Sequence, residues 1–178
     1  MEYPKFSGLE SDAVLVSPHL KISASYEWER DIRLFNAFHG LNNQIHVFVI
    51  LFNATSGLQA ALSQREYWRG GNKNEFTICL GLDDAQNVKW CKAFSWCDLP
   101  QMETALESWY LEHTHLDFKE LTNWLEANVS TLWKRKEFKD FKYLGKKLTP
   151  WKSALVGFLT LAACALFIYI AYYLTTTQ

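Results

Sequence analysis

The order of apolar and polar positions predicts alternating helices and strands. Residues 25–40 carry apolar side chains at helical spacing, with Ser25 as the N-cap and Gly40 as the stop. The run 45–53 is almost uninterrupted in apolar residues, which is typical of a central strand covered on both faces. Residues 13–16 form a candidate edge strand. The apolar positions of the first helix are Trp28, Ile32, Phe35 and Phe38.

The pattern continues with a helix at 57–68, a hairpin of strands at 75–82 and 87–96, and helices at 99–113 and 117–136. In the second hairpin strand the large apolar residues stand at even positions, which indicates a half-buried strand. Strands interleaved with helices predict an α/β fold, a small mixed sheet covered by helices.

The C-terminal region contains 22 residues without a charge, 153–174. At about 1.5 Å per residue this run can cross a hydrocarbon core of roughly 30 Å. Trp151 at one edge and Tyr169, Tyr172 and Tyr173 near the other suit the two interfaces. We therefore expect one C-terminal transmembrane helix, followed by a short tail at 175–178.

Charge is divided unevenly along the chain. Residues 1–133 hold ten basic and seventeen acidic side chains. A juxtamembrane segment, 134–152, holds eight basic residues against two acidic ones. Basic residues on the N-terminal side of a span predict that the domain 1–133 stays in the cytoplasm, and they can bind anionic lipid headgroups. These membrane-surface residues are Lys134, Arg135, Lys136, Lys139, Lys142, Lys146, Lys147 and Lys152.

The N-terminal sequence is acidic and lacks the apolar core of a signal peptide. We therefore expect a single-pass, tail-anchored protein that is inserted after translation. The four cysteines lie in or next to apolar runs, which fits a reducing compartment. No C-x-x-C pair or His/Cys ligand spacing occurs, so the sequence gives no support to a zinc site. Nucleic acid is not an expected partner, because the basic segment lies beside the span.

The only paired glycines, Gly70 and Gly71, raise the question of a phosphate-binding loop. Such a loop follows a strand and opens a helix, whereas here a helix comes first and a strand follows. We interpret the pair as a helix stop with a left-handed glycine that leads into the hairpin. Beside the acidic hairpin tip, the residues Trp68, Arg69, Lys73 and Asn74 form a candidate partner-binding patch.

Signals for catalysis or metal binding are few. Asp83 and Asp84 at the hairpin tip are a candidate Ca²⁺ or Mg²⁺ site, and no other cofactor is expected. His113, His115 and Asp117 form a second metal-like pattern, for which a solvated turn is the favoured interpretation. His46 is interpreted as a packed histidine within a strand. No nucleophile elbow or zinc-protease motif is present in the sequence.

The order of elements from Tyr26 to Trp96 resembles that of the TPM domain family. The local likenesses are Trp68, Gly70, Gly71, Asn74 and the hairpin that follows. The resemblance implies an α/β sandwich with a maintenance or accessory role at membrane complexes, and a disputed phosphatase activity. TPM domains typically lie outside the cytoplasm, whereas the basic segment here predicts the inside.

The sequence thus favours a non-enzymatic membrane accessory or adaptor protein whose acidic, Trp-rich domain binds a protein partner. Self-association through small residues of the span (Gly157, Ala162, Ala163 and Ala165) is a further expectation. Two alternatives stay open: a membrane-anchored, metal-dependent hydrolase that uses Asp83 and Asp84, and a viral or phage membrane or virion component.

Overall fold

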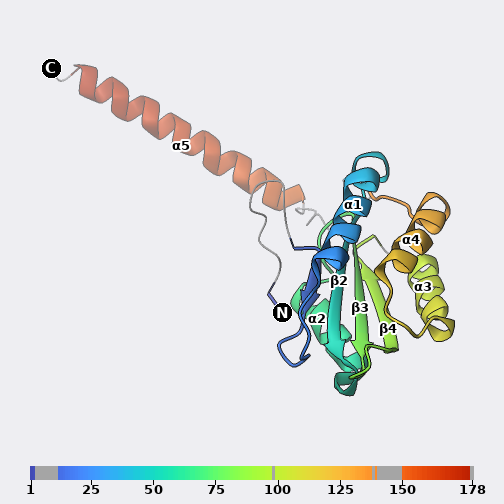
Figure 1. The fold of residues 1–178 in the computed structure, drawn as a ribbon. Helices are drawn as coiled ribbons and strands as arrows, with labels where there is room; N and C mark the ends of the chain where they lie inside the picture. Colours follow the sequence, from blue (N-terminus) through green and yellow to red (C-terminus); the bar gives the residue numbers. More distant parts are fainter. Residues whose placement is uncertain (3–11, 98, 138, 140–149, 177–178) are drawn as a thin grey trace. The chain divides into compact units, whose positions relative to one another are not determined.

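The structure is a computed structural model that describes residues 1–2, 12–97, 99–137, 139 and 150–176, except for the side chains of 150, 153, 171 and 173–176. The chain divides into two compact units, Met1–Lys136 and Glu137–Gln178. Figure 1 shows the elements of both units.

The first unit is an α/β domain built on four strands and four α-helices among its described residues. Its elements in chain order are β1 (Val14–Val16), α1 (Tyr26–Asn43), β2 (His46–Asn53), the short 3₁₀ helix η1 (Ala54–Ser56), α2 (Gly57–Tyr67), β3 (Glu75–Leu82), β4 (Val88–Ser95), α3 (Pro100–Glu112) and α4 (Phe118–Leu132).

The strands form one mixed sheet in the order β1-β2-β3-β4. β1, β2 and β3 are parallel, and β4 runs antiparallel to β3. The register places Val14, Val49, Ile78 and Ala93 side by side across the sheet. The expected small mixed sheet is confirmed. β2 is a central strand buried on both faces, and β1 is an edge strand, as the sequence predicts.

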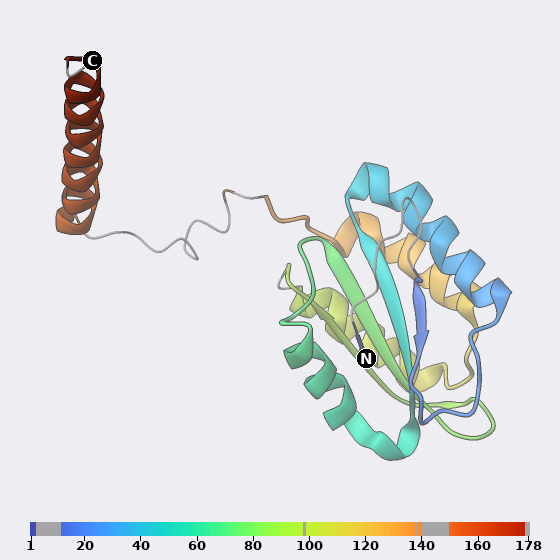
Figure 2. The same ribbon diagram turned by 90° about the vertical axis from the view of Figure 1, so that its left-hand side faces the viewer.

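Helices cover both faces of the sheet (Figure 2). The larger core joins one face to α1, α3 and α4, and the smaller core joins the other face to α2. The β1-α1-β2 and β2-α2-β3 crossovers step across the sheet in the same direction, yet their helices lie on opposite faces. The two crossovers therefore have opposite hands, so one of them departs from the usual right-handed rule.

Helix α1 confirms the predicted N-cap but not the predicted end. The Ser25 hydroxyl accepts a hydrogen bond from the Trp28 amide at 3.2 Å. Gly40 does not stop the helix, which continues to Asn43 and ends at Gln44 in the left-handed conformation (φ 51°). A glycine costs only about 1 kcal/mol inside a helix, and tertiary packing outweighs that cost here.

The buried face of α1 also differs from the prediction at one position. Ile32 and Phe35 are buried, and Trp28 stacks on Phe118 of α4 with ring centroids 5.1 Å apart. Phe38 is 70% exposed, because its position in the helix points away from the sheet, on the same side as Leu34. The helix therefore has apolar residues on its outer side as well as on its inner side.

Strand β4 is buried on both faces over its last three residues, 93–95, whereas Lys89 is exposed and residues 90–92 are half-buried, so the predicted half-buried strand holds for the first part of its length. Trp90 and Phe94 pack in the smaller core under α2, whereas Ala93 packs in the larger core. Trp96, beyond the strand end, is 42% exposed. A register shift follows Gly81, whose missing side chain makes room for the Trp90 ring.

Helix α4 ends earlier than the predicted residue 136. Asp117 caps its start by accepting hydrogen bonds from the amides of Lys119 and Glu120. The last helical residue is Leu132, and the basic residues after it give the helix no further apolar side to bury. Trp133 then packs on Phe76 and donates its indole N–H to the Asn43 carbonyl at 3.0 Å.

The second unit contains the 27-residue helix α5 (Pro150–Thr176), which extends past the predicted end of the span at residue 174. Its described side chains are exposed, including those of Leu161, Phe167 and Ile168. No helix offers, within its fully described residues, a stretch both long and apolar enough to cross a membrane. The transmembrane helix therefore stays a prediction.

Candidate functional site

The turn after α2 has the geometry of a helix stop, as the sequence predicts. The amide of Gly70 donates to the Arg65 carbonyl at 2.7 Å, and the amide of Arg69 donates to the Glu66 carbonyl at 2.9 Å. This pair of hydrogen bonds is the Schellman motif. The first left-handed residue is Arg69 (φ 53°), where a glycine was expected, and the two glycines continue with positive φ.

A buried carboxylate holds the rest of this turn. Glu75 accepts a hydrogen bond from the Asn72 amide at 2.6 Å, and its side chain lies against Gly71. The Asn74 carbonyl accepts from the His46 amide at 2.9 Å, which joins the turn to β2. These hydrogen bonds use the amides and carbonyls for turn and sheet structure, and the order helix, turn, strand excludes a phosphate loop of the Walker type.

The predicted partner-binding patch is only partly at the surface. Trp68 is 6% exposed, because its ring packs edge-on against Phe48 and its indole donates to the Met1 carbonyl at 3.0 Å. The expectation of a surface tryptophan at this position is therefore wrong. Asn74 is half-buried and accepts from the Cys97 thiol at 3.4 Å. Arg69 is exposed and Lys73 is half-buried, so these two residues remain as a candidate contact.

The acidic hairpin tip does not lie beside this turn. The turn precedes β3 and Asp83 follows it, so the eight residues of the strand separate them by about 25 Å. Asp83 accepts hydrogen bonds from the amides of Ala85 and Asn87 and pairs with Lys89 at 3.0 Å. The Asn87 backbone and Lys89 together lower the pKa of Asp83 to about 2. Asp84 is exposed. Asp83 therefore organises the hairpin turn, and the metal site stays a prediction without support from this geometry.

The histidines have structural partners. His113 stacks on Trp109 with ring centroids 4.3 Å apart, and its Nδ1 lies 3.0 Å from the Trp109 carbonyl. His115 forms an isolated bridge with Asn87. His46 packs on Phe48, and burial lowers its pKa. Within the described residues no group of three or more His, Cys, Asp or Glu side chains could hold a metal ion.

A groove of about 350 Å³ at the β4 edge of the sheet contains groups that can carry chemistry. Lys92 pairs with Glu107 at 2.8 Å, and Glu107 also accepts from the Ala93 amide at 3.3 Å. Burial raises the pKa of the Cys91 thiol and of the Tyr110 hydroxyl. A thiol with a raised pKa is a poor nucleophile. This groove therefore resembles a covered sheet edge more than a catalytic centre.

The outer side of α1 is a feature that the sequence analysis missed. Tyr26, Leu34, Phe38 and Leu41 are 81%, 49%, 70% and 85% exposed. They recur at steps of about one or two helical turns, so the spacing could have revealed a second apolar side. A groove of about 760 Å³ runs beside this side at the β1 edge, where Glu29 accepts the amides of Ala13 and Val14.

The basic segment is described only in part. Lys134, Arg135 and Lys139 are exposed and Lys136 is half-buried. Lys152 lies over the Trp151 ring, 5.7 Å from its centroid. The remaining predicted membrane-surface residues, Lys142, Lys146 and Lys147, lie outside the described residues.

Comparison with known proteins does not add to this geometry. The resemblance to TPM domains therefore stays a prediction that rests on Trp68, the glycine turn and the hairpin. The chain was compared with protein-family models, with characterised proteins and with solved structures, and none of them matches it.

Proposed function

We propose that this chain is a membrane-anchored accessory or adaptor protein. In this proposal α5 spans the bilayer, and the α/β domain stays in the cytoplasm and binds a protein partner at the membrane surface. The observation that carries the proposal is the exposure of the large apolar side chains of α5. Leu161, Phe167 and Ile168 are 72%, 75% and 70% exposed.

The composition of α5 supports a hydrocarbon environment. Residues 153–174 contain ten Leu, Ile, Val and Phe residues and no charge. At roughly 0.3–0.6 kcal/mol for each such residue at a helix centre, insertion is favoured by several kcal/mol. Thr160, the only threonine of the run, donates its hydroxyl to the Val156 carbonyl at 2.9 Å, so this polar group needs no water.

The flanks support one orientation. Lys152 and Trp151 lie next to each other at the start of the helix, a pairing of cation and ring that suits a headgroup layer. Eight basic residues lie in 134–152, on the N-terminal side of the span. Both features favour a cytoplasmic α/β domain.

The partner-binding role is supported by the outer side of α1. The exposed apolar residues Tyr26 and Leu34 line the groove at the β1 edge. Within this groove, the Arg33 guanidinium donates a hydrogen bond to the Glu29 carboxylate at 2.7 Å. Contiguous exposed apolar surface with a polar rim is typical of a protein-binding site. No arrangement of the described residues favours the hydrolase alternative, since Asp83 is engaged in its own turn.

Alkaline extraction of membranes tests the anchor. We expect the full chain to stay in the membrane pellet and the double variant Leu161→Arg, Phe167→Arg to enter the supernatant. The matched control is Leu111→Arg, an equally exposed position in the α/β domain (81%), which should stay in the pellet. Release of the unaltered chain by alkali contradicts the anchor.

Site-specific crosslinking tests the adaptor role. A photo-crosslinking residue at Leu34 should capture a defined protein in native membranes, whereas the same residue at Leu111 should not. A phosphatase assay of the full chain tests the hydrolase alternative. Turnover that disappears in Asp83→Ala would favour the hydrolase and overturn the adaptor proposal.

A further inference from the structure

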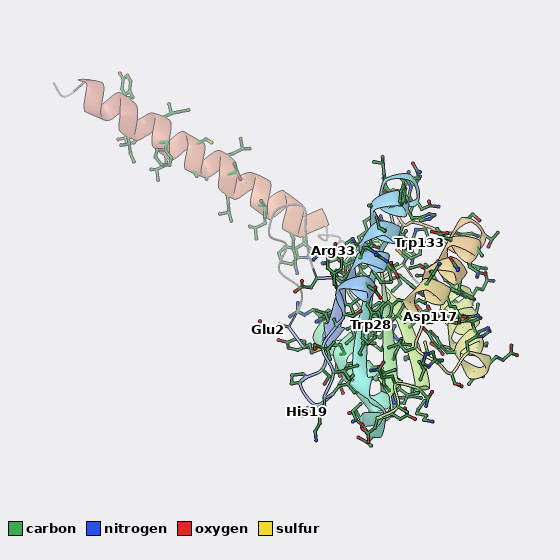
Figure 3. The ribbon with its side chains drawn as sticks, in the orientation of Figure 1. Glu2, His19, Trp28, Arg33, Asp117 and Trp133 are labelled. Atoms are coloured by element: carbon green, nitrogen blue, oxygen red, sulfur yellow. The ribbon has the colours of Figure 1, made fainter. Side chains whose placement is uncertain are left out.

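Three segments of the α/β domain end close together. The Trp133 indole donates to the Asn43 carbonyl at 3.0 Å, so the last residues of α1 lie beside the point where the chain leaves α4. The His46 amide donates to the Asn74 carbonyl at 2.9 Å, which brings the glycine turn to the same end of the sheet. Figure 3 shows Trp133 toward this end of the domain and His19 toward the other.

Large apolar side chains are exposed at this end. Phe38 and Leu41, on the last turns of α1, are 70% and 85% exposed. Tyr67 at the end of α2 is 65% exposed, and Trp96 after β4 is 42% exposed. Gly70 lies against the Trp96 ring, since an added Cβ would stand 3.1 Å from its Cδ1. Tyr and Trp side chains, which combine an apolar ring with a polar group, favour the interface between a membrane and water.

Cations lie among these side chains. The turn contributes Arg69 and Lys73, and the chain after Trp133 contributes Lys134 and Arg135. Arg69 takes the left-handed backbone conformation of the helix stop, and its side chain is exposed. We name this end the exit pole and define it by Phe38, Leu41, Arg69, Lys73, Lys134 and Arg135.

The opposite end of the domain has a different character. The ends of β3 and α3 and the start of α4 place acidic side chains there, with Lys89 paired to Asp83. The exit pole thus combines four cations with Glu66 and the buried Glu75, whereas the opposite end carries five carboxylates beside Lys89 and Lys119. The acidic residues are Asp83, Asp84, Glu112, Asp117 and Glu120.

We propose that the exit pole docks on an anionic phospholipid bilayer, so that the domain rests on the membrane in one orientation. This inference relies on the proposed function, in which α5 spans that bilayer. The chain leaves the domain at the exit pole, and the 13 residues from 137 to 149 can extend at most about 3.6 Å each. The cations meet the lipid phosphates, the rings and Leu41 enter the interface, and the opposite acidic end points away.

A fluorescent probe at matched positions tests the docking. Leu41 and Leu111 are 85% and 81% exposed and lie at the two ends of the domain. In a Cys164→Ala background, Leu41→Cys and Leu111→Cys are each labelled with NBD, and the background protein alone measures labelling of the other three cysteines. The full chain is placed in nanodiscs of phosphatidylcholine with or without phosphatidylserine. Lipids spin-labelled near the headgroup act as quenchers.

With phosphatidylserine, the probe at residue 41 should show a blue-shifted emission that the spin-labelled lipid quenches. The probe at residue 111 should keep the emission of a probe in water. Lys134→Glu should reduce quenching at residue 41, whereas Lys119→Glu, an exposed lysine at the opposite end, should leave it unchanged. Higher salt should reduce the quenching as well, because it screens the lipid charge.

Three results would overturn the docking. One is a probe at residue 41 that stays in water on anionic discs, and another is equal quenching at both positions. The third is a blue shift without lipid quenching, which would assign the exit pole to a protein contact. Failure of the docking can be distinguished from failure of the membrane anchor. A chain that alkali does not extract but whose exit pole stays in water refutes only the docking.

Discussion

Two phenylalanines show how the two units of this chain differ. Phe76 in β3 is fully buried, whereas Phe167 in α5 is 75% exposed, although both lie in apolar runs. In the α/β domain, the sheet and its helices cover each other's apolar sides. In α5, a single helix, the described residues of its own unit do not cover the apolar side chains. Hydrophobicity alone therefore does not distinguish a buried strand from an exposed helix, and the difference is whether the element's own unit supplies the surface that covers it.

Truncation of the two phenylalanines gives the largest expected difference. Phe76→Ala should lower the unfolding free energy of the domain by about 3–5 kcal/mol, because it leaves a cavity beside Trp133. Phe167→Ala should leave the unfolding of the domain unchanged. Denaturant titration of the full chain in micelles, followed by tryptophan fluorescence, measures both. Equal losses would mean that α5 belongs to the folding unit of the domain.

Glycine substitutions sharpen the contrast between packed and open positions. Gly81→Val should cost about 3 kcal/mol, the upper part of the range for overpacking. A Cβ at residue 81 would stand 2.0 Å from the Trp90 ring. The indole N–H of this ring also donates a hydrogen bond to the Ala54 carbonyl at 3.1 Å. Gly40→Ala is the control, since its Cβ would meet only the Ile45 carbonyl oxygen, at 3.5 Å, and alanine favours a helix. Thermal unfolding should show a loss in the first variant and no loss in the second.

Helix capping gives a smaller effect. Asp117→Ala should lower the stability of the domain by about 1 kcal/mol, because the amides of Lys119 and Glu120 lose their acceptor. Asp117→Asn should retain most of that stability, since the amide oxygen can cap in the same way. An equal loss in both variants would assign the effect to charge instead of capping. Urea unfolding of the three full-length proteins compares them.

The hairpin tip should respond to pH. The folded pKa of Asp83 is about 2, below the usual value of 3.8, so its stabilising effect is present above pH 4 and is lost as the pH falls toward 2. Asp83→Asn should flatten the pH dependence of stability in that window, with a small effect because solvent reaches the carboxylate and screens its charge. Asp84→Asn is the control. A pH profile in which Asp83→Asn retains the full slope would contradict this role of Asp83.

Local patterns predicted the elements well and their surroundings less well. The Ser25 cap and the order of helices and strands along the chain followed from capping and periodicity. The end of α1 did not, because packing carries the helix past Gly40. Trp68 was expected at the surface, and its burial depends on the Phe48 ring and the Met1 carbonyl, which are distant in sequence. The spacing of Phe38 and Leu41 was visible, yet which side of a helix faces the sheet depends on tertiary contacts.

The candidate site shows the same limit. Residues near in sequence, such as Lys73 and Asp83, lie at opposite ends of a strand. Residues far apart in sequence, such as Asn43 and Trp133, are in contact. The exit pole therefore could not be assembled from sequence spacing, because it depends on where three separate segments end.

Hydrogen exchange of the full chain in lipid nanodiscs tests the central claim most directly. The account predicts that amides at the centre of α5, residues 158–168, are protected for as long as those of β2 and β3. In the double variant Leu161→Arg, Phe167→Arg, the same amides should exchange rapidly while the α/β domain keeps its protection. Rapid exchange at residues 158–168 in the unaltered chain would contradict the assignment of α5 to the bilayer.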